Sequence, residues 1–157
     1  MLVLDEIELL PPSVLVETAF QKKVDAMQYA MEQMPQTECP ITNRFTPGLY
    51  IRECFVPKGT LIVSKIHKTE HPYIISKGDI SVWIEGVGAV RLKAPHTGVT
   101  KPGTRRVLFA HEDTIWTTFH PSDETDLEKL EALLIEPRDV ELSLTGEIKT
   151  CLGLPQE

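Results

Sequence analysis

The chain has 157 residues, of which 41% are apolar, and its 23 Asp and Glu residues outnumber its 16 Lys and Arg residues to give a formal net charge of -7. This length suits one domain with appended segments, and the acidic balance argues against non-specific binding to nucleic acid or anionic membranes, which needs an excess of basic residues. No apolar run approaches the roughly 18 residues of a membrane-spanning helix, and the acidic start differs from a secretory signal, so we expect a soluble cytoplasmic protein.

The first predicted element is a helix over Val14–Met34, which Ser13 can cap. The opposite face from its apolar stripe carries polar residues, among them Asp25 and Gln28, and we expect that face to lie in solvent. Two partners for the stripe stay open, since it can pack on this chain's own sheet or on a second copy in a homodimer or higher homo-oligomer. The stripe consists of Val16, Phe20, Val24, Met27, Met31 and Met34.

Short runs of β-branched and aromatic residues, separated by turn residues, follow from Phe45 to Pro121. Strands at intervals of about ten residues are typical of a sandwich or barrel. No helix long enough for a β-α-β crossover lies between them, which excludes Rossmann-like and TIM-barrel folds. The predicted strands are Tyr50–Val56, Leu61–His67, Tyr73–Ile75, Ile80–Glu85, Ala89–Leu92, Arg106–Ala110 and Ile115–His120.

A second helix is predicted after the strands, where Asp123 or Thr125 can cap it. Its apolar stripe is Leu127, Leu130, Leu133 and Leu134. Val140–Leu144 fits either a further strand or a mobile tail. We therefore divide the chain into a helical extension (residues 1–44), a β-barrel (45–122) and a C-terminal helix with its tail (123–157).

His67 and His71 are the first candidates for a functional site. If the three residues between them form a hairpin loop, the histidines face each other with their Cβ atoms roughly 5 Å apart and can share a divalent ion. Glu70 can complete a set of two histidines and one carboxylate, which suits iron, manganese or zinc, or can act as a general base. The alternative is an ordinary pair of hairpin histidines that Glu70 neutralises.

The segment Gly59–Gly78 resembles the first motif of the cupin superfamily, whose members have a small jelly-roll barrel, also called a double-stranded β-helix. With Gly78 fixing the register, His67 takes the position of the motif's second histidine. Lys65 stands where the first histidine is usual, and His71 stands where the glutamate is usual.

Pro102–Arg106 resembles the turn of the second cupin motif and brings Arg106 near the position of its histidine. The resemblance covers residues 50 to about 119. It implies a mainly β protein with a cupin-type double-stranded β-helix barrel, flanked by the N-terminal amphipathic helix and the C-terminal helix, and a divalent metal in the barrel mouth. Two of the family's four usual ligand types are missing here.

Other stretches resemble small cupin-like proteins of tailed bacteriophages. This resemblance implies a phage origin, a place in the host cytoplasm or in the virion, and no particular reaction. The stretches are Gly48–Glu53, Pro57–Thr60, Ser76–Ile80 and Glu112–Thr118.

The remaining candidates surround the same barrel mouth. If the last two predicted strands form a hairpin, His120 lies roughly opposite Arg106 and can supply a third metal ligand. Arg106 cannot bind a metal, but it can hold a carboxylate or phosphate. Lys65 and Arg105 can add positive charge, and Tyr73 can line the pocket.

Two functions remain open on these residues. In the first, the protein binds a divalent metal and a small anionic ligand in the barrel mouth, where isomerase, lyase and oxygenase chemistry all fit. In the second, it is a non-catalytic homo-oligomeric phage protein, associated with the virion or bound to a host factor, that works through its N-terminal helix.

Overall fold

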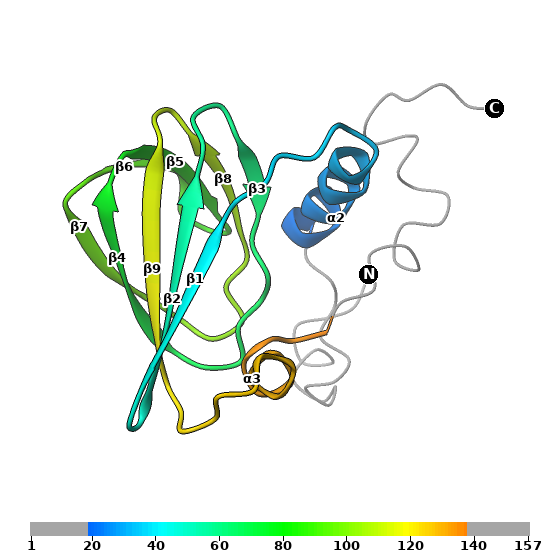
Figure 1. The fold of residues 1–157 in the computed structure, drawn as a ribbon. Coiled ribbons are helices and arrows are strands. Elements are labelled where there is room, and N and C mark those ends of the chain that lie inside the picture. Colours follow the sequence, from blue (N-terminus) through cyan, green and yellow to red (C-terminus); the bar gives the residue numbers. More distant parts are fainter. Residues whose placement is uncertain (1–18, 138–157) are drawn as a thin grey trace, which may run out of the picture.

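The computed structural model describes residues 19–137 (Figure 1), so the predictions for residues 14–18 and for Val140–Leu144 lie outside the described residues. The described part contains two helices and nine strands. In chain order they are α2 (Ala19–Glu32), β1 (Ile41–Thr46), β2 (Leu49–Val56), β3 (Leu61–Val63), β4 (His71–Lys77), β5 (Asp79–Ile84), β6 (Gly88–Lys93), β7 (His96–Thr100), β8 (Arg106–Ala110), β9 (Thr114–Pro121) and α3 (Leu127–Leu134).

The strands form two antiparallel sheets that face each other across the core (Figure 1). One sheet has the order β1-β2-β9-β4-β7 and the other β3-β8-β5-β6. Apart from the extra edge strand β1, the chain from β2 to β9 passes to the opposite sheet at every step except between β5 and β6, which pair within one sheet, and this is the arrangement of a jelly roll. The strand order therefore confirms the predicted double-stranded β-helix barrel with a helix on either side of it in sequence.

The structure corrects two expected hairpins. His67 and His71 are not hairpin partners, because β3 belongs to one sheet and β4 to the other. The hairpin expected to place His120 opposite Arg106 is also absent, because β8 and β9 lie in different sheets. Both expectations assumed that strands next to each other in the sequence pair with each other. In a jelly roll, most consecutive strands lie in opposite sheets.

The observed strands also differ from the sequence pattern in other ways. The predicted strand over Leu61–His67 ends at Val63, after which the chain leaves its sheet to cross the barrel. β1 and β7 were not predicted. β1 is almost entirely exposed and so shows little apolar alternation, and β7 contains Gly98, a residue that is disfavoured in strands.

Gly98 is required where it stands, because a Cβ there would lie 2.5 Å from the ring of Tyr73. Tyr73 belongs to the barrel's apolar core, in which side chains from both sheets pack together. The buried members of this core are Tyr73, Ile75, Ile80, Val82 and Leu108.

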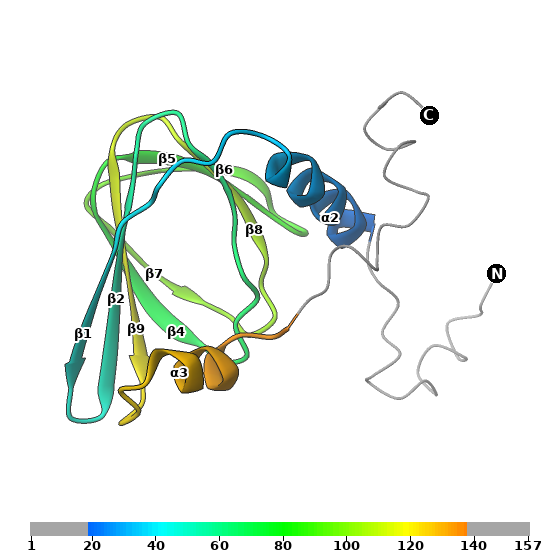
Figure 2. The ribbon, with the colours of Figure 1, turned by 45° about the vertical axis from the view of Figure 1, so that its right-hand side comes forward.

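Helix α2 lies outside the barrel on the side of β3 and β8 (Figures 1 and 2). Asp25 of this helix forms a buried ion pair with Arg105, whose guanidinium also donates to Gln28 at 2.7 Å. The expectation that Asp25 and Gln28 face solvent was therefore wrong, as was the expectation that Arg105 adds charge to the mouth. A helical period shows which residues share a face, but an ion pair can bury the polar one.

Helix α3 closes one end of the barrel (Figure 2). Its N-cap is Asp126, whose carboxylate accepts from the backbone N–H of Lys129. Leu130 and Leu134 pack against Tyr50, so they tie the helix to β2. Neither described helix has both the length and the apolar character needed to cross a membrane.

The buried ion pair gives a stability prediction. Asp25→Ala leaves the Arg105 guanidinium buried without its carboxylate and is expected to lower the free energy of unfolding by about 3 kcal/mol or more. The exposed pair between Arg44 and Glu53 is the control, and Glu53→Ala is expected to cost less than about 1 kcal/mol. Urea unfolding of the full chain measures both. Equal effects would show that the buried pair does not anchor α2.

Candidate metal centre

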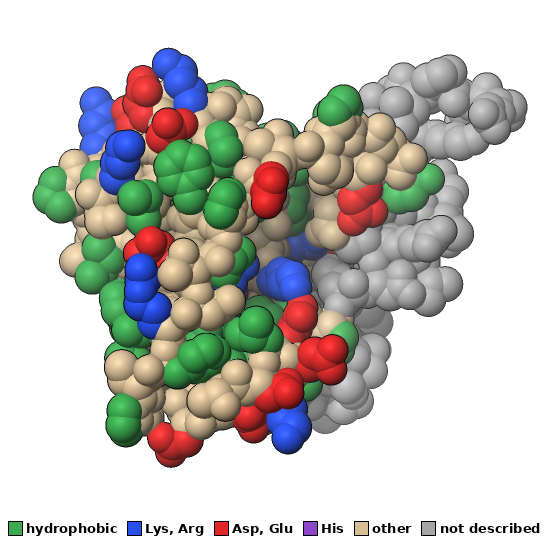
Figure 3. All heavy atoms as spheres, in the orientation of Figure 1, with side chains coloured by type: hydrophobic (Ala, Val, Ile, Leu, Met, Phe, Trp, Pro, Cys, Tyr) green, Lys and Arg blue, Asp and Glu red, His purple; other side chains and the backbone are tan. Residues whose placement is uncertain are grey.

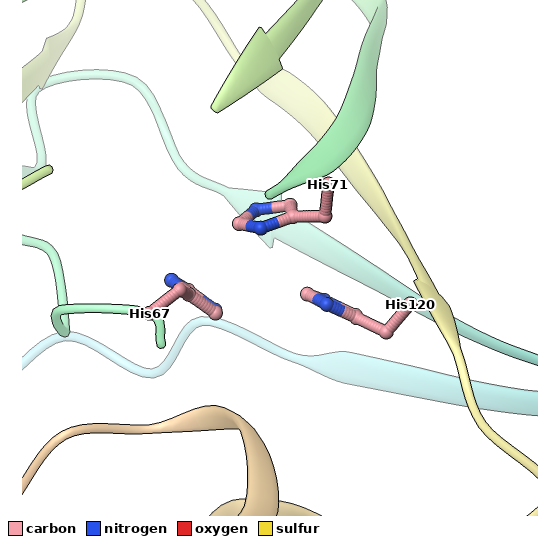
Figure 4. Close-up of side chains that lie close together, drawn as sticks. All are labelled: His67, His71 and His120. Atoms are coloured by element: carbon pink, nitrogen blue, oxygen red, sulfur yellow. The ribbon is translucent and has the colours of Figure 1, made fainter. Parts of the chain in front are cut away.

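Three histidines, two of them four residues apart and the third about fifty residues later in the chain, converge inside the barrel (Figure 4). His67 lies in the crossing after β3, His71 begins β4, and His120 lies near the end of β9. Their ligand atoms all lie within 4.8 Å of one another. The ring centroids are 4.4 Å apart for His67 and His71, 4.5 Å for His71 and His120, and 5.4 Å for His67 and His120. This arrangement suits a single ion held by three imidazoles.

The strand register places two of these histidines. β4 pairs with β9 so that Tyr73 lies opposite Thr118. His71 is two residues before Tyr73, and His120 is two residues after Thr118, so in this antiparallel pair both face the interior at the same level. The period of two in a strand therefore brings them together without a hairpin.

His67 is held by the loop between β7 and β8 and by the end of α3. The carbonyl of His67 accepts from the backbone N–H of Gly103, and the N–H of Lys68 donates to the carbonyl of Leu134. His67 also forms an isolated β-bridge with Ile135. Contacts with this loop and with the end of α3 thus hold His67 over the barrel end, beside the other two histidines.

Hydrogen bonds leave one nitrogen of His71 and one of His120 free for an ion. The Nδ1–H of His71 donates to the carbonyl of Thr69 at 3.1 Å, which leaves Nε2 unprotonated. The Thr118 hydroxyl donates to the carbonyl of Arg52, so its oxygen accepts from Nε2–H of His120 at 2.9 Å. Nδ1 of His120 then carries a lone pair, and it is buried without any hydrogen-bond partner. A metal ion would satisfy this orphaned atom.

The interior keeps the histidines neutral. Burial is the main cause that lowers the pKa of His67 to about 4 and that of His120 to about 3, from an ordinary value of 6.5, and His71 and Arg52 add to both shifts. Burial also lowers the pKa of His71, against the effect of its hydrogen bond to Thr69. Neutral imidazole is the form that binds metal.

The histidines lie in a cavity of about 620 Å³ that also contains Arg52, Lys65 and Arg106. Arg106 donates from Nη1 to the Thr100 hydroxyl at 2.9 Å, and its guanidinium lies 5.6 Å from the ring centroid of Tyr73. In the space-filling view, Lys and Arg side chains lie in a recess of this face, beside Asp and Glu side chains (Figure 3). The cavity thus combines neutral metal ligands with cationic side chains.

The other predicted site residues lie outside the histidine cluster. Glu70 is exposed and forms an ion pair with Lys101, and within residues 19–137 the three histidines alone make up the ligand cluster. Lys65 lines the cavity but is paired with Glu131 of α3. The ring of Tyr73 stacks on Trp116, with 4.5 Å between the ring centroids, and its face contacts the guanidinium of Arg106.

Sequence analysis missed Arg52, Thr100 and Thr118. Arg52 faces the cavity because it alternates with Tyr50 and Cys54 on the inner face of β2. That alternation was visible in the sequence and could have identified Arg52. The two threonines became recognisable only through their hydrogen bonds to Arg106 and His120.

No protein-family model matches the chain, and no curated protein matches it in sequence. Among solved structures, the chain is similar to an uncharacterized conserved protein with a double-stranded beta-helix domain from Klebsiella pneumoniae, with 15% identity and a TM-score of 0.46 over 59% of this chain and 90% of that one. A cupin superfamily protein from Desulfitobacterium hafniense gives 8% identity and a TM-score of 0.47 over 58% and 84%. KdgF from Halomonas sp. gives 18% identity and a TM-score of 0.47 over 57% and 86%. The fold assignment rests on the strand order described above.

The lowered pKa values predict acid sensitivity of the metal-free protein. Between pH 6.5 and about 4 the unfolded chain binds protons on His67 that the folded chain does not, and His120 behaves in the same way. Stability is therefore fully present above pH 6.5 and falls as the pH drops through this window. Urea unfolding with a chelator present measures the dependence. The variant with glutamine at all three histidine positions should show a shallower slope, and an unchanged slope would contradict the account.

Proposed function

We propose that the protein binds one divalent metal ion through His67, His71 and His120 and holds a small anionic ligand beside it with Arg106. The convergence of the three imidazoles around the unpartnered Nδ1 of His120 carries this proposal. Three neutral ligands leave the ion's full charge in place, and Arg106 adds another positive charge nearby. An anion is the ligand that balances both.

The ligand set narrows the choice of ion. Of the ions expected from the sequence, iron and zinc suit imidazole nitrogens better than manganese, which, like magnesium and calcium, prefers oxygen. Three protein ligands also leave a coordination position open for water or substrate. A bound ion of this kind would supply Lewis-acid chemistry or an activated water.

The chain's own residues would orient the partners of that ion. Thr118 fixes the tautomer of His120, and the Thr69 carbonyl fixes that of His71. Arg106, held by Thr100 and Tyr73, would grip the anion. A role for Glu70 as ligand or general base remains a prediction from the sequence, as does any catalysed reaction.

Homo-oligomerisation through the N-terminal helix and a bacteriophage origin likewise remain expectations from the sequence. The metal proposal does not depend on them. Asp25 and Gln28 of α2 engage Arg105 of the same chain, which supports packing of this helix on its own barrel.

Metal content tests the proposal directly. Protein purified in metal-supplemented medium is expected to carry close to one ion per chain by elemental analysis, and His67→Ala, His71→Ala and His120→Ala should each lose most of it. His96→Ala is the matched control, since His96 lies outside the cluster and is expected to retain the ion. A wild-type protein without stoichiometric metal would overturn the proposal.

Thr118→Val tests the orienting role of the hydroxyl at nearly constant side-chain volume. It removes the acceptor for Nε2–H of His120, so metal affinity should fall about 10- to 100-fold while saturating metal still fills the site. Thr117→Val, on the opposite face of β9, should leave the affinity unchanged. Competition with a chromogenic chelator measures both affinities. Equal affinities for the two variants would contradict the role assigned to Thr118.

A further inference from the structure

From the level of the histidines toward the barrel core, the lining of the cavity changes from polar to apolar. The cross-strand residue pairs of β2 and β9 mark successive levels along the barrel axis. These pairs are Tyr50 and His120, Arg52 and Thr118, Cys54 and Trp116, and Val56 and Thr114. The first two levels carry the histidines and a cation. The level below them carries an indole and a thiol, and the last one carries a valine that lines the cavity.

The second sheet follows the same order. Arg106 lies on the inner face of β8 and reaches Thr100, which pairs with His71. Two residues farther along β8, Leu108 lines the cavity and packs in the core with Ile62 and Trp116. The charged lining residues of this sheet therefore reach no farther toward the core than Arg106, and the next inward-facing residue of β8 is apolar.

The cavity opens between the edge strands of the two sheets. β1 is the edge of one sheet and β3 is the edge of the other, and both contribute lining residues. On this side the apolar end is lined by Ile41 of β1 and by Ile62 and Val63 of β3. Ile41 is 38% exposed, so a ligand that covers it would remove apolar surface from water.

Arg106 can receive an anion here. Its guanidinium contacts the Thr100 hydroxyl and the face of Tyr73, and within residues 19–137 no carboxylate lies at ion-pair distance from it. Around the cavity, three cations, Arg52, Lys65 and Arg106, face one carboxylate, that of Glu131. A guanidinium binds a carboxylate in a bidentate manner.

We propose that the cavity binds an amphipathic monocarboxylate, with its acid group at Arg106 beside the histidines and its hydrocarbon or aromatic body on Ile62, Leu108 and Trp116. The location beside the histidines rests on the proposed function, whereas the preference for an acid with an apolar body does not require the metal. A cavity of about 620 Å³ is large enough for a ligand of this kind.

The lining disfavours heavily hydroxylated or polyanionic ligands. Below Arg106 the cavity offers aliphatic side chains, Trp116 and the thiol of Cys54, which are poor partners for hydroxyl groups. A sugar acid would bury hydroxyls without hydrogen bonds there, at a cost for each unpaired group. A fatty or aromatic acid carries its only polar group at the end where Arg106 lies.

Binding of straight-chain acids to the full-length protein tests the proposal. Trp116 is a natural reporter, and Trp83→Phe removes the only other tryptophan. Affinity should rise about fourfold for each added methylene from butanoate to octanoate. Octanol, which lacks the charge, and succinate, which lacks the apolar body, should bind much more weakly. Titration calorimetry on the wild-type chain provides the same comparison without the substitution.

Two pairs of variants test which cavity residues contact the acid end and the apolar end of the ligand. Arg106→Met should remove the preference for octanoate over octanol, whereas Arg44→Met, with the same charge change on an exposed residue, should keep it. Ile41→Asp should weaken octanoate binding at least tenfold, and Thr42→Asp, the next residue on the opposite face of β1, should not.

Titrations with and without chelator separate this proposal from the metal proposal. Chain-length dependence in both conditions supports the acid site even if no metal binds. Equal binding of butanoate and octanoate, or tighter binding of succinate than of octanoate, would overturn the acid site and leave the metal content untouched.

Discussion

The antiparallel register between β4 and β9 is the constraint on which the candidate site depends. Because Tyr73 lies opposite Thr118, the residues two positions away, His71 and His120, meet at one level on the inner face. A slip of one residue would turn one of them outward and break the cluster. Gly98 supports the same arrangement, since it leaves room for the Tyr73 ring that carries Arg106.

The candidate site also buries polar groups at a cost in stability. Burying His120 leaves its Nδ1 without a hydrogen bond, and the interior holds its pKa far below the ordinary value. Arg106, in the same cavity, is partly buried without a carboxylate partner among residues 19–137. Such costs are expected where groups are kept for binding rather than for stability. An ion at the histidines and an anion at Arg106 would relieve both.

Much of the fold could be predicted from the sequence, and less of the site. The turn residues and short apolar runs gave seven of the strands, while β1 and β7 lacked the apolar alternation that reveals a strand. His67, His71 and His120 were predicted as ligands, but through hairpins that the jelly roll does not form. The burial of Asp25 against Arg105 depends on a contact between segments 80 residues apart, which no local pattern encodes.

The central claim is that the three histidines form one metal centre. Anomalous diffraction from crystals of the protein grown with zinc, recorded on both sides of the zinc absorption edge, tests it most directly. We expect a single strong peak inside the barrel, about 2.0–2.1 Å from one nitrogen each of His67, His71 and His120. Zinc found only on surface carboxylates, with no peak between the three imidazoles, would contradict it.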